Sequence, residues 1–321
     1  MTDSATIVVP TPMEKTFRAY TPQQGAIYAK GRPGYHQRLY KNIIDHHTST
    51  GGKLDTLLDV GCGPGIVARE LGPQFARAIG LDPAAGMIAT ARSLSGASST
   101  SEPIRFDVST AEELGSNLSP PIPDASIDLI TAATAAHWFD MAGFWAAAAR
   151  VLKPGGTVAI WTGSTKHIHP STPNAERIQN SVQAFRKEHL APFMAHGNLL
   201  GEAMYETLPL PWTLEKPVPE LDESTFVRRD WNKDGVVAEN EEFFMGQHTM
   251  DLDSIEKFVC TASPVTRWRE AHPDAVGTER DVVRILRREL ERHLHDAGVE
   301  KGKELVTTGV AGVLLMVKKK A

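Results

Sequence analysis

Short apolar runs alternate with amphipathic stretches through the first half of the chain. Each run is four to seven residues long and is bounded by glycine, proline or charged residues, as expected for buried parallel strands. Five strands are predicted, at residues 54–60, 78–82, 104–108, 128–133 and 157–161. Helical patterns fall between them, and such strand–helix alternation is typical of a mostly parallel sheet with helices on both faces. The pattern therefore predicts an α/β, Rossmann-like fold.

The second half departs from this alternation. Residues 164–250 contain a bend rich in proline and histidine, a helical stretch near 175–190 and short strand-like pieces. Beyond residue 251, two amphipathic helices precede a final apolar strand. We predict a seven-stranded sheet and a four-part organisation: a flexible leader at 1–16, a core with N-terminal lid helices at 17–163, an inserted substrate cap at 164–250, and helices with a last strand completing the core at 251–321.

Composition narrows the class of protein without assigning a function. The 321 residues are 41% hydrophobic, which suffices for a substantial core. Basic residues number 34 against 39 acidic ones, with no long basic block, so nucleic acid is not an expected partner. The first residues do not resemble a signal peptide, and no run is long enough to span a membrane. We therefore expect a cytoplasmic protein that binds no membrane, as a monomer or homodimer.

A glycine-rich turn follows the first predicted strand. Asp59 is followed by Gly61, Gly63 and Gly65, with Cys62 inside the turn. Glycine allows a tight turn and lets a ligand lie against the main chain. The dinucleotide fingerprint needs a third small residue at the position of Ile66, so a nicotinamide cofactor is disfavoured. A turn without any ligand remains the alternative at this point.

A second acidic residue ends the next predicted strand. Asp82 stands where a carboxylate can bind both hydroxyls of a ribose, and Pro83 and Met87 open the following helix. Together with the pattern D-x-G-x-G-x-G, this arrangement resembles motif I and the following acidic position of the class I S-adenosylmethionine-dependent methyltransferases. The resemblance implies S-adenosylmethionine as cofactor, with S-adenosylhomocysteine as product.

The resemblance also implies roles for particular residues. Asp59 would organise the turn and the methionine amine, and Asp82 would hold the ribose. The stretch 61–65, including Cys62, would pass beneath the methionyl group. Thr110 stands where the family often has Asp or Asn against the adenine, so the backbone near Ala111, with Glu112, is expected to serve there. Ala133, at the end of the fourth strand, completes the predicted cofactor contacts.

Two further segments resemble a narrower group, the fungal trans-aconitate methyltransferases and their cantharidin-methylating relatives. The first is Y-x-x-x-R-P-x-Y, from which Tyr28 would line the pocket and Arg32 would face the methionine carboxylate. A surface turn with a solvated arginine is the alternative. The second is A-H-W-F-D, in which His137 would contact substrate or cofactor and Trp138 would shield the sulfonium. Core packing is the alternative for Trp138.

The resemblance implies a small-molecule O-methyltransferase whose acceptor is a carboxylic acid, with no metal required. A carboxylate is ionised at neutral pH, so His137 would orient it rather than act as a base. For a phenol, amine or thiol acceptor, His137 would be the candidate base. The alternatives are an N-, S- or phenol-O-methyltransferase of secondary metabolism, and a protein that binds the cofactor without transferring methyl.

Charged residues in the second half give two weaker signals. Basic side chains of the predicted cap are candidates for binding a carboxylate: Arg177, Arg186, Lys187, Arg228 and Arg229. The stretch from Asp230 to Glu241 matches the spacing of an EF-hand calcium loop. Strand-like residues on both sides, including Phe243–Met245, favour a turn between hairpin strands instead.

Overall fold

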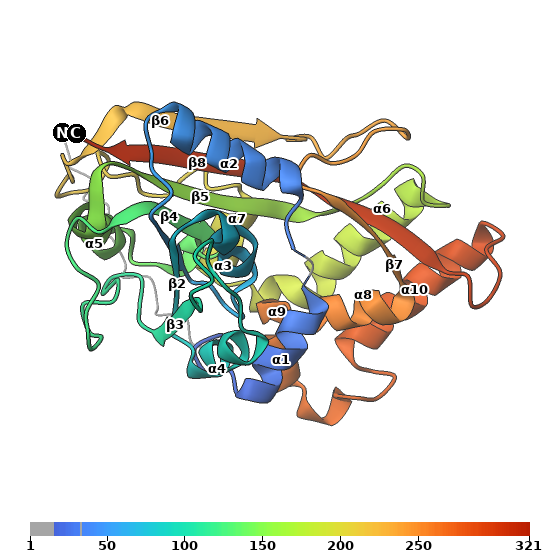
Figure 1. The fold of residues 1–321 in the computed structure, drawn as a ribbon. Coiled ribbons are helices and arrows are strands. Elements are labelled where there is room, and N and C mark those ends of the chain that lie inside the picture. The colour runs from blue at the N-terminus through green and yellow to red at the C-terminus, as the bar shows by residue number, and fades with distance from the viewer. Residues whose placement is uncertain (1–15, 33) are drawn as a thin grey trace, which may run out of the picture.

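A computed structural model describes residues 16–32 and 34–321 of the chain. The predicted leader, apart from Thr16, therefore lies outside the described residues, as does Pro33. Within the described part, the α/β class is confirmed: strands form one central sheet with helices around it (Figure 1). Among the described helices, none has the length and apolar character needed to cross a bilayer.

The described strands form an eight-stranded sheet, one strand more than predicted. Seven of them follow the order β3-β2-β1-β4-β5-β8-β6, and β7 pairs with β8 outside this path. The strands are β1 (Thr56–Val60), β2 (Arg77–Asp82), β3 (Arg105–Val108), β4 (Ile127–Ala133), β5 (Leu152–Ile168), β6 (Leu221–Trp231), β7 (Gln247–Asp251) and β8 (Leu305–Lys319). The first five are parallel to one another, whereas β8 is antiparallel to all its neighbours.

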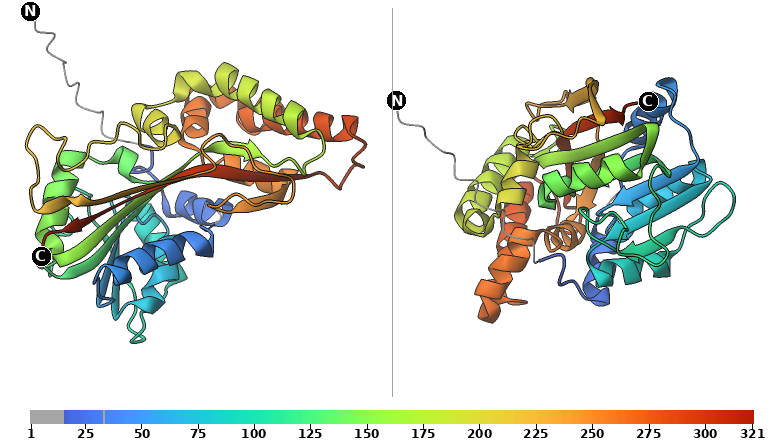
Figure 2. Two further views of the ribbon diagram at one scale, coloured as in Figure 1. Left: turned by 90° about the horizontal axis from the view of Figure 1, so that it is seen from above. Right: turned by 90° about the vertical axis from the view of Figure 1, so that its left-hand side faces the viewer.

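β5 is much longer than the predicted strand. It begins at Leu152 and continues to Ile168, well beyond Trp161. Along most of this length it pairs with β8, from Thr157↔Lys318 to Ile168↔Thr308. These two strands run past the other parallel strands and into the helical part of the molecule (Figures 1 and 2).

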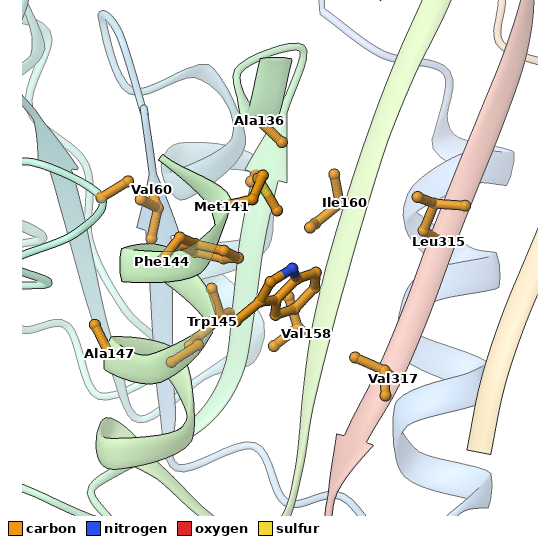
Figure 3. Packing of buried hydrophobic residues seen from close by; sticks show 14 of the residues in the cluster. Val60, Ala136, Met141, Phe144, Trp145, Ala147, Val158, Ile160, Leu315 and Val317 are labelled. Atoms are coloured by element: carbon orange, nitrogen blue, oxygen red, sulfur yellow. The ribbon is translucent and has the colours of Figure 1, made fainter. Parts of the chain in front are cut away.

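Side-chain alternation along β5 explains how the sheet is covered on both faces. Val158 and Ile160 join one hydrophobic cluster with α5, whereas Trp161 joins the other cluster with α2, α3 and α4. In Figure 3, Phe144 and Trp145 of α5 point toward Val158 and Ile160 of β5. The helices of the core are α1 (Pro22–Gly31), α2 (Gln37–Ser49), α3 (Ile66–Leu71), α4 (Ala85–Leu94) and α5 (Met141–Val151).

A second group of helices forms the cap, which we define as α6, α8, α9 and α10 with β7 and the adjoining ends of β5 and β8. These helices share a hydrophobic cluster of their own. The cap helices are α6 (Ala175–Phe185), α8 (Leu252–Val259), α9 (Ser263–Ala271) and α10 (Val282–Asp296). A further helix of the second half, α7 (His196–Glu202), is not part of the cap. The predicted ranges 164–250 and 251–321 interleave in space, because β6 joins the central sheet and α8–α10 join the cap.

The stretch 230–241 is neither an EF-hand nor a hairpin turn. It begins in the last two residues of β6 and ends before β7, so it lacks the flanking helices of a calcium loop. Phe243–Met245 are not in a strand, contrary to the prediction. β6 and β7 pair with different parts of β8 and not with each other, and the stretch simply connects them. Asp230 itself pairs with Arg228 at 2.8 Å.

Helix α1 packs closely against α4, and two glycines allow this close contact. A methyl group added to Gly86 would lie 2.1 Å from the carbonyl oxygen of Tyr20, just before α1. A methyl group on Gly25 would lie 2.6 Å from Oγ1 of Thr90. The close approach of the two backbones therefore requires glycine at both positions.

The variant Gly86→Ala is expected to displace α1 while leaving the core folded. Alanine raises the helix propensity of α4 by about 1 kcal/mol, but its methyl group cannot be accommodated beneath α1. Trypsin should then cleave after Lys30, in α1, several times faster than in the wild type, with Tm changed by only a few degrees. Ala89→Ser, on the exposed side of α4, is the control, and unchanged cleavage of Gly86→Ala would contradict this packing.

Candidate active site

A cavity of about 480 Å³ lies at the carboxyl ends of the parallel strands and extends into the cap. Ligands of open α/β sheets bind at this edge. Most of the residues predicted from the sequence line it: Tyr28, Arg32, Asp59, Gly61, Cys62, Gly63, Asp82, Pro83, Met87, Ala111, Glu112, Ala133, His137 and Trp138. Gly65 is the exception. It precedes α3 with φ of +81°, and a side chain there would collide with Phe106.

The glycine turn presents bare backbone to the cavity. Gly63 has φ of +53°, and a methyl group added to it would meet no atom within 4 Å. A ligand can therefore approach the main chain closely at this position. Cys62 is buried, and burial raises the pKa of its thiol, so the thiol stays protonated and unreactive.

Asp82 connects the glycine turn to the turn after β2. Its Oδ2 accepts a hydrogen bond from the Gly63 amide at 2.9 Å, and its Oδ1 accepts one from the Ala84 amide at 2.8 Å. Carboxylate oxygens act as acceptors, and each oxygen has more than one acceptor position. The carboxylate thus fixes the cavity wall and can also bind hydroxyl groups of a ligand.

Asp59 and Arg32 each have a buried polar atom with no hydrogen-bond partner. Asp59 is 1% exposed; its Oδ1 accepts from Thr131 at 2.8 Å, whereas its Oδ2 is unpaired. Burial raises the pKa of this carboxyl group to about 7. The guanidinium of Arg32 lies between the rings of Tyr28 and Phe258, 5.2 and 5.0 Å from their centroids, and its Nε is unpaired. Unpaired buried polar atoms in a cavity indicate a polar ligand.

His137 lies in the turn after β4 and is 8% exposed. Its Nδ1 is 2.9 Å from the hydroxyl oxygen of Tyr205. Burial, reinforced by the positive charge of Arg32, lowers the pKa of His137 to about 3. The imidazole is therefore neutral at physiological pH and is a weak base. Beside it, Trp138 lines the cavity with its ring centroid 6.0 Å from that of Phe17.

At the adenine side expected from the sequence, Ala111 is buried and Glu112 is fixed by a contact with the next loop. Oε1 of Glu112 accepts a hydrogen bond from the Asp140 amide at 2.8 Å. Asp140 in turn begins α5 by accepting from the Ala142 amide. Ala111 and Glu112 both line the cavity, so the loop after β3 forms one wall of it.

Lys166 is a site residue that the sequence analysis missed. Its Nζ lies 4.6 Å above the ring of Phe258, and it lines the cavity where β5 enters the cap. Burial and the charge of Arg32 lower its pKa to about 8, so the ammonium form still predominates at pH 7. No carboxylate lies within ion-pair distance of Lys166 or Arg32 among residues 16–32 and 34–321.

The orientation of Lys166 depends on an irregularity in β5. Gly163 pairs with Gly312 and Lys166 pairs with Val310, so β5 has one extra residue at this point. Such a β-bulge changes the phase of side-chain alternation. A strand predicted to end at Trp161 gave no reason to place Lys166 at the site. The available signal was the continuation of strand-forming residues beyond Trp161.

The basic residues expected in the cap do not provide an equivalent group. Of the five, only Arg186 lines the cavity, and it is paired with Glu202. Arg228 binds Asp230 and the carbonyl oxygen of Met204. Arg229 donates to Asn42. Arg228 and Arg229 are thus held by contacts within the chain, and the expectation that a basic residue of the cap binds an anion stays a prediction.

Comparison with known proteins finds similarity to methyltransferases. A family model described as a methyltransferase domain matches residues 58–160. A Saccharomyces cerevisiae protein assigned as an S-adenosylmethionine-dependent methyltransferase is 25% identical over 274 residues, covering 85% of this chain and 88% of the relative. A methyltransferase of Aspergillus candidus is 32% identical over 166 residues, and this match covers 51% of this chain and 50% of the relative.

Solved structures support the fold. A protein of Anaeromyxobacter dehalogenans assigned as a type II methyltransferase superposes with a TM-score of 0.55 at 22% identity, covering 90% of this chain and 97% of the other. The order of the sheet and the glycine turn after β1 are those of a Rossmann-like fold. The methyltransferase domain at residues 58–160 and the similarity to these relatives support a class I S-adenosylmethionine-dependent methyltransferase with S-adenosylmethionine as its cofactor.

The buried imidazole of His137 makes stability depend on pH. Because its pKa is about 3 when folded and near 6.5 when unfolded, only the unfolded chain takes up a proton between these values. The free energy of unfolding should fall as pH decreases below about 6, with His137 contributing up to about 1.4 kcal/mol per pH unit. Denaturant unfolding at several pH values should show a shallower slope for His137→Asn. Equal slopes for both proteins would contradict a neutral, buried His137.

Proposed function

We propose that the protein transfers the methyl group of S-adenosylmethionine to a carboxylate oxygen of a small organic acid and forms a methyl ester. The main support is Lys166, a cation in the cavity wall without a carboxylate partner. Lys166 is partly buried, and a charge removed from water is costly unless it is paired, so an anionic ligand is the natural partner for this ammonium group.

The cofactor accounts for the other unpaired groups. Its amino-acid end has an ammonium and a carboxylate, which complement Oδ2 of Asp59 and the guanidinium of Arg32. Asp82 would accept hydrogen bonds from the ribose hydroxyls, and the bare backbone at Gly63 would lie against the methionyl part. Ala111 and Glu112 would border the adenine, with Ala133 at the opposite strand end. With Arg32 assigned to the cofactor, Lys166 is left for the acceptor.

When bound, S-adenosylmethionine supplies a methyl group on a sulfonium sulfur, and displacement by the acceptor oxygen breaks the carbon–sulfur bond and releases S-adenosylhomocysteine. The residues of the chain have to align the acceptor with this methyl group and exclude water. Lys166 would orient the carboxylate, and the aromatic residues Tyr28 and Trp138 would shield the reacting atoms from solvent.

The state of His137 favours an acceptor that needs no deprotonation. With a pKa of about 3, its imidazole accepts a proton poorly at neutral pH. A carboxylate is already ionised under these conditions, whereas phenols and most amines are protonated. His137 would then act by orientation, through its contact with Tyr205. The resemblance to trans-aconitate methyltransferases points to the same acceptor class.

The acceptor class can be tested directly with methyl-labelled S-adenosylmethionine. We expect label to be transferred to members of a panel of small carboxylic acids, with the methyl esters identified by mass spectrometry. A parallel panel of phenols, amines and thiols serves as the comparison. Methylation confined to this second panel would refute the proposal while leaving the methyltransferase class unaffected.

Binding of the cofactor should release protons near neutral pH. Asp59 is about half protonated at pH 7, and an ammonium group beside it would favour the ionised form. The affinity for S-adenosylhomocysteine should therefore rise up to tenfold per pH unit below pH 7. Calorimetry in buffers of different ionisation enthalpy measures the released protons. 5′-Methylthioadenosine, which lacks the amine, is the control, and equal proton release by both ligands would contradict the placement.

Loss of Lys166 should affect the acceptor and not the cofactor. Removal of a charge-assisted hydrogen bond costs about 1.5–3 kcal/mol, so Lys166→Met should raise the KM of the best acid of the panel by about ten- to a hundredfold. The dissociation constant of S-adenosylhomocysteine should stay within about twofold. Lys166→Arg should recover part of the loss, and Lys187→Met, at an exposed position outside the cavity, should have no effect. An unchanged KM in Lys166→Met would contradict the assignment.

A further inference from the structure

The cavity has an apolar part that none of the residues discussed above accounts for. It lies inside the cap, where aliphatic side chains from three helices face it. They are Val182 of α6, Ile255 and Val259 of α8, and Leu286 and Leu290 of α10. These side chains have no polar atoms, so they can offer a ligand only apolar contacts.

These residues also belong to or pack against the hydrophobic cluster of the cap. Ile255, Leu286 and Leu290 are each less than 9% exposed, and Val182 and Val259 are packed against them. A cluster that surrounds a cavity loses the dispersion contacts that a filled core would have. An apolar ligand would restore them, and binding sites are commonly apolar pockets with a few polar groups that fix orientation.

Lys166 lies next to the apolar wall. Nζ of Lys166 is 4.6 Å from the centroid of the Phe258 ring. Phe258 lies on α8, between Ile255 and Val259 along the helix. β5 brings Lys166 to the junction between the core and the cap. A ligand with its anionic group at Lys166 would therefore extend its remaining atoms among α6, α8 and α10.

We propose that the acceptor is an amphipathic carboxylic acid, with a hydrocarbon body held among α6, α8 and α10 and its carboxylate at Lys166. This inference rests on the proposed carboxyl methylation and adds the class of acid. The proposal favours a monocarboxylic acid with an aliphatic body over a compact acid with several carboxylates. The additional carboxylates of a compact acid would lie against Leu286 and Leu290, where a charge is costly.

Straight-chain acids from butanoate to dodecanoate, together with a compact tricarboxylate, test the proposal with the full-length enzyme and S-adenosylmethionine. Each buried methylene should raise kcat/KM roughly fourfold until the pocket is filled. Rates that do not rise with chain length, or turnover of the tricarboxylate alone, would refute the apolar pocket and preserve carboxyl methylation. If no acid is methylated but phenols or amines are, the underlying proposed function fails as well.

Substitutions at the pocket give an independent test. Val182→Trp should fill the space and lower kcat/KM for decanoate at least tenfold while changing that for butanoate less than twofold. Gln183→Trp, on the exposed side of the same helix, is the matched control. Leu286→Ala should move the preferred chain length upward. Unchanged affinity for S-adenosylhomocysteine shows that each variant is folded, and an unaltered chain-length profile in both Val182→Trp and Leu286→Ala would overturn the proposal.

Discussion

One buried carboxylate holds the wall of the site together. Asp82 accepts hydrogen bonds from the Gly63 amide and the Ala84 amide, and so joins the turns that follow two neighbouring strands. Amides at turns and helix starts lack partners within secondary structure, and a carboxylate between them satisfies both. The glycine turn, the start of α4 and, through the Gly86 contact, the position of α1 all depend on this arrangement.

The core and the cap are joined by a shared pair of strands. β5 and β8 begin in the central sheet, where α5 covers one face, and they continue between the helices of the cap. In the proposed assignment, the strand ends and turns of the core form the cofactor side of the cavity, and the cap forms the acceptor side. The acid groups lie on the first side, and Lys166 with the apolar wall lies on the second.

Much of the fold could be predicted because short buried strands give continuous apolar runs, and because Asp59, the three glycines and Asp82 follow them at characteristic spacings. The full length of β5 could not be predicted, because the part of the strand beyond Thr162 is only partly buried and lacks a continuous apolar pattern. Lys166 and Phe258 are separated by more than ninety positions. Only tertiary packing brings them together, whereas spacing along the chain describes residues that share one element. The extra strand β7 has a similarly mixed pattern, with polar side chains at most positions.

The extra residue in β5 has a consequence for how such enzymes can diverge. Deletion of Ser164 or Thr165 would restore strict pairing with β8 and turn the Lys166 ammonium to the opposite face of the strand. A one-codon deletion would thus remove the positive charge from this end of the cavity. Preference for charged or neutral acceptors could change in a single evolutionary step.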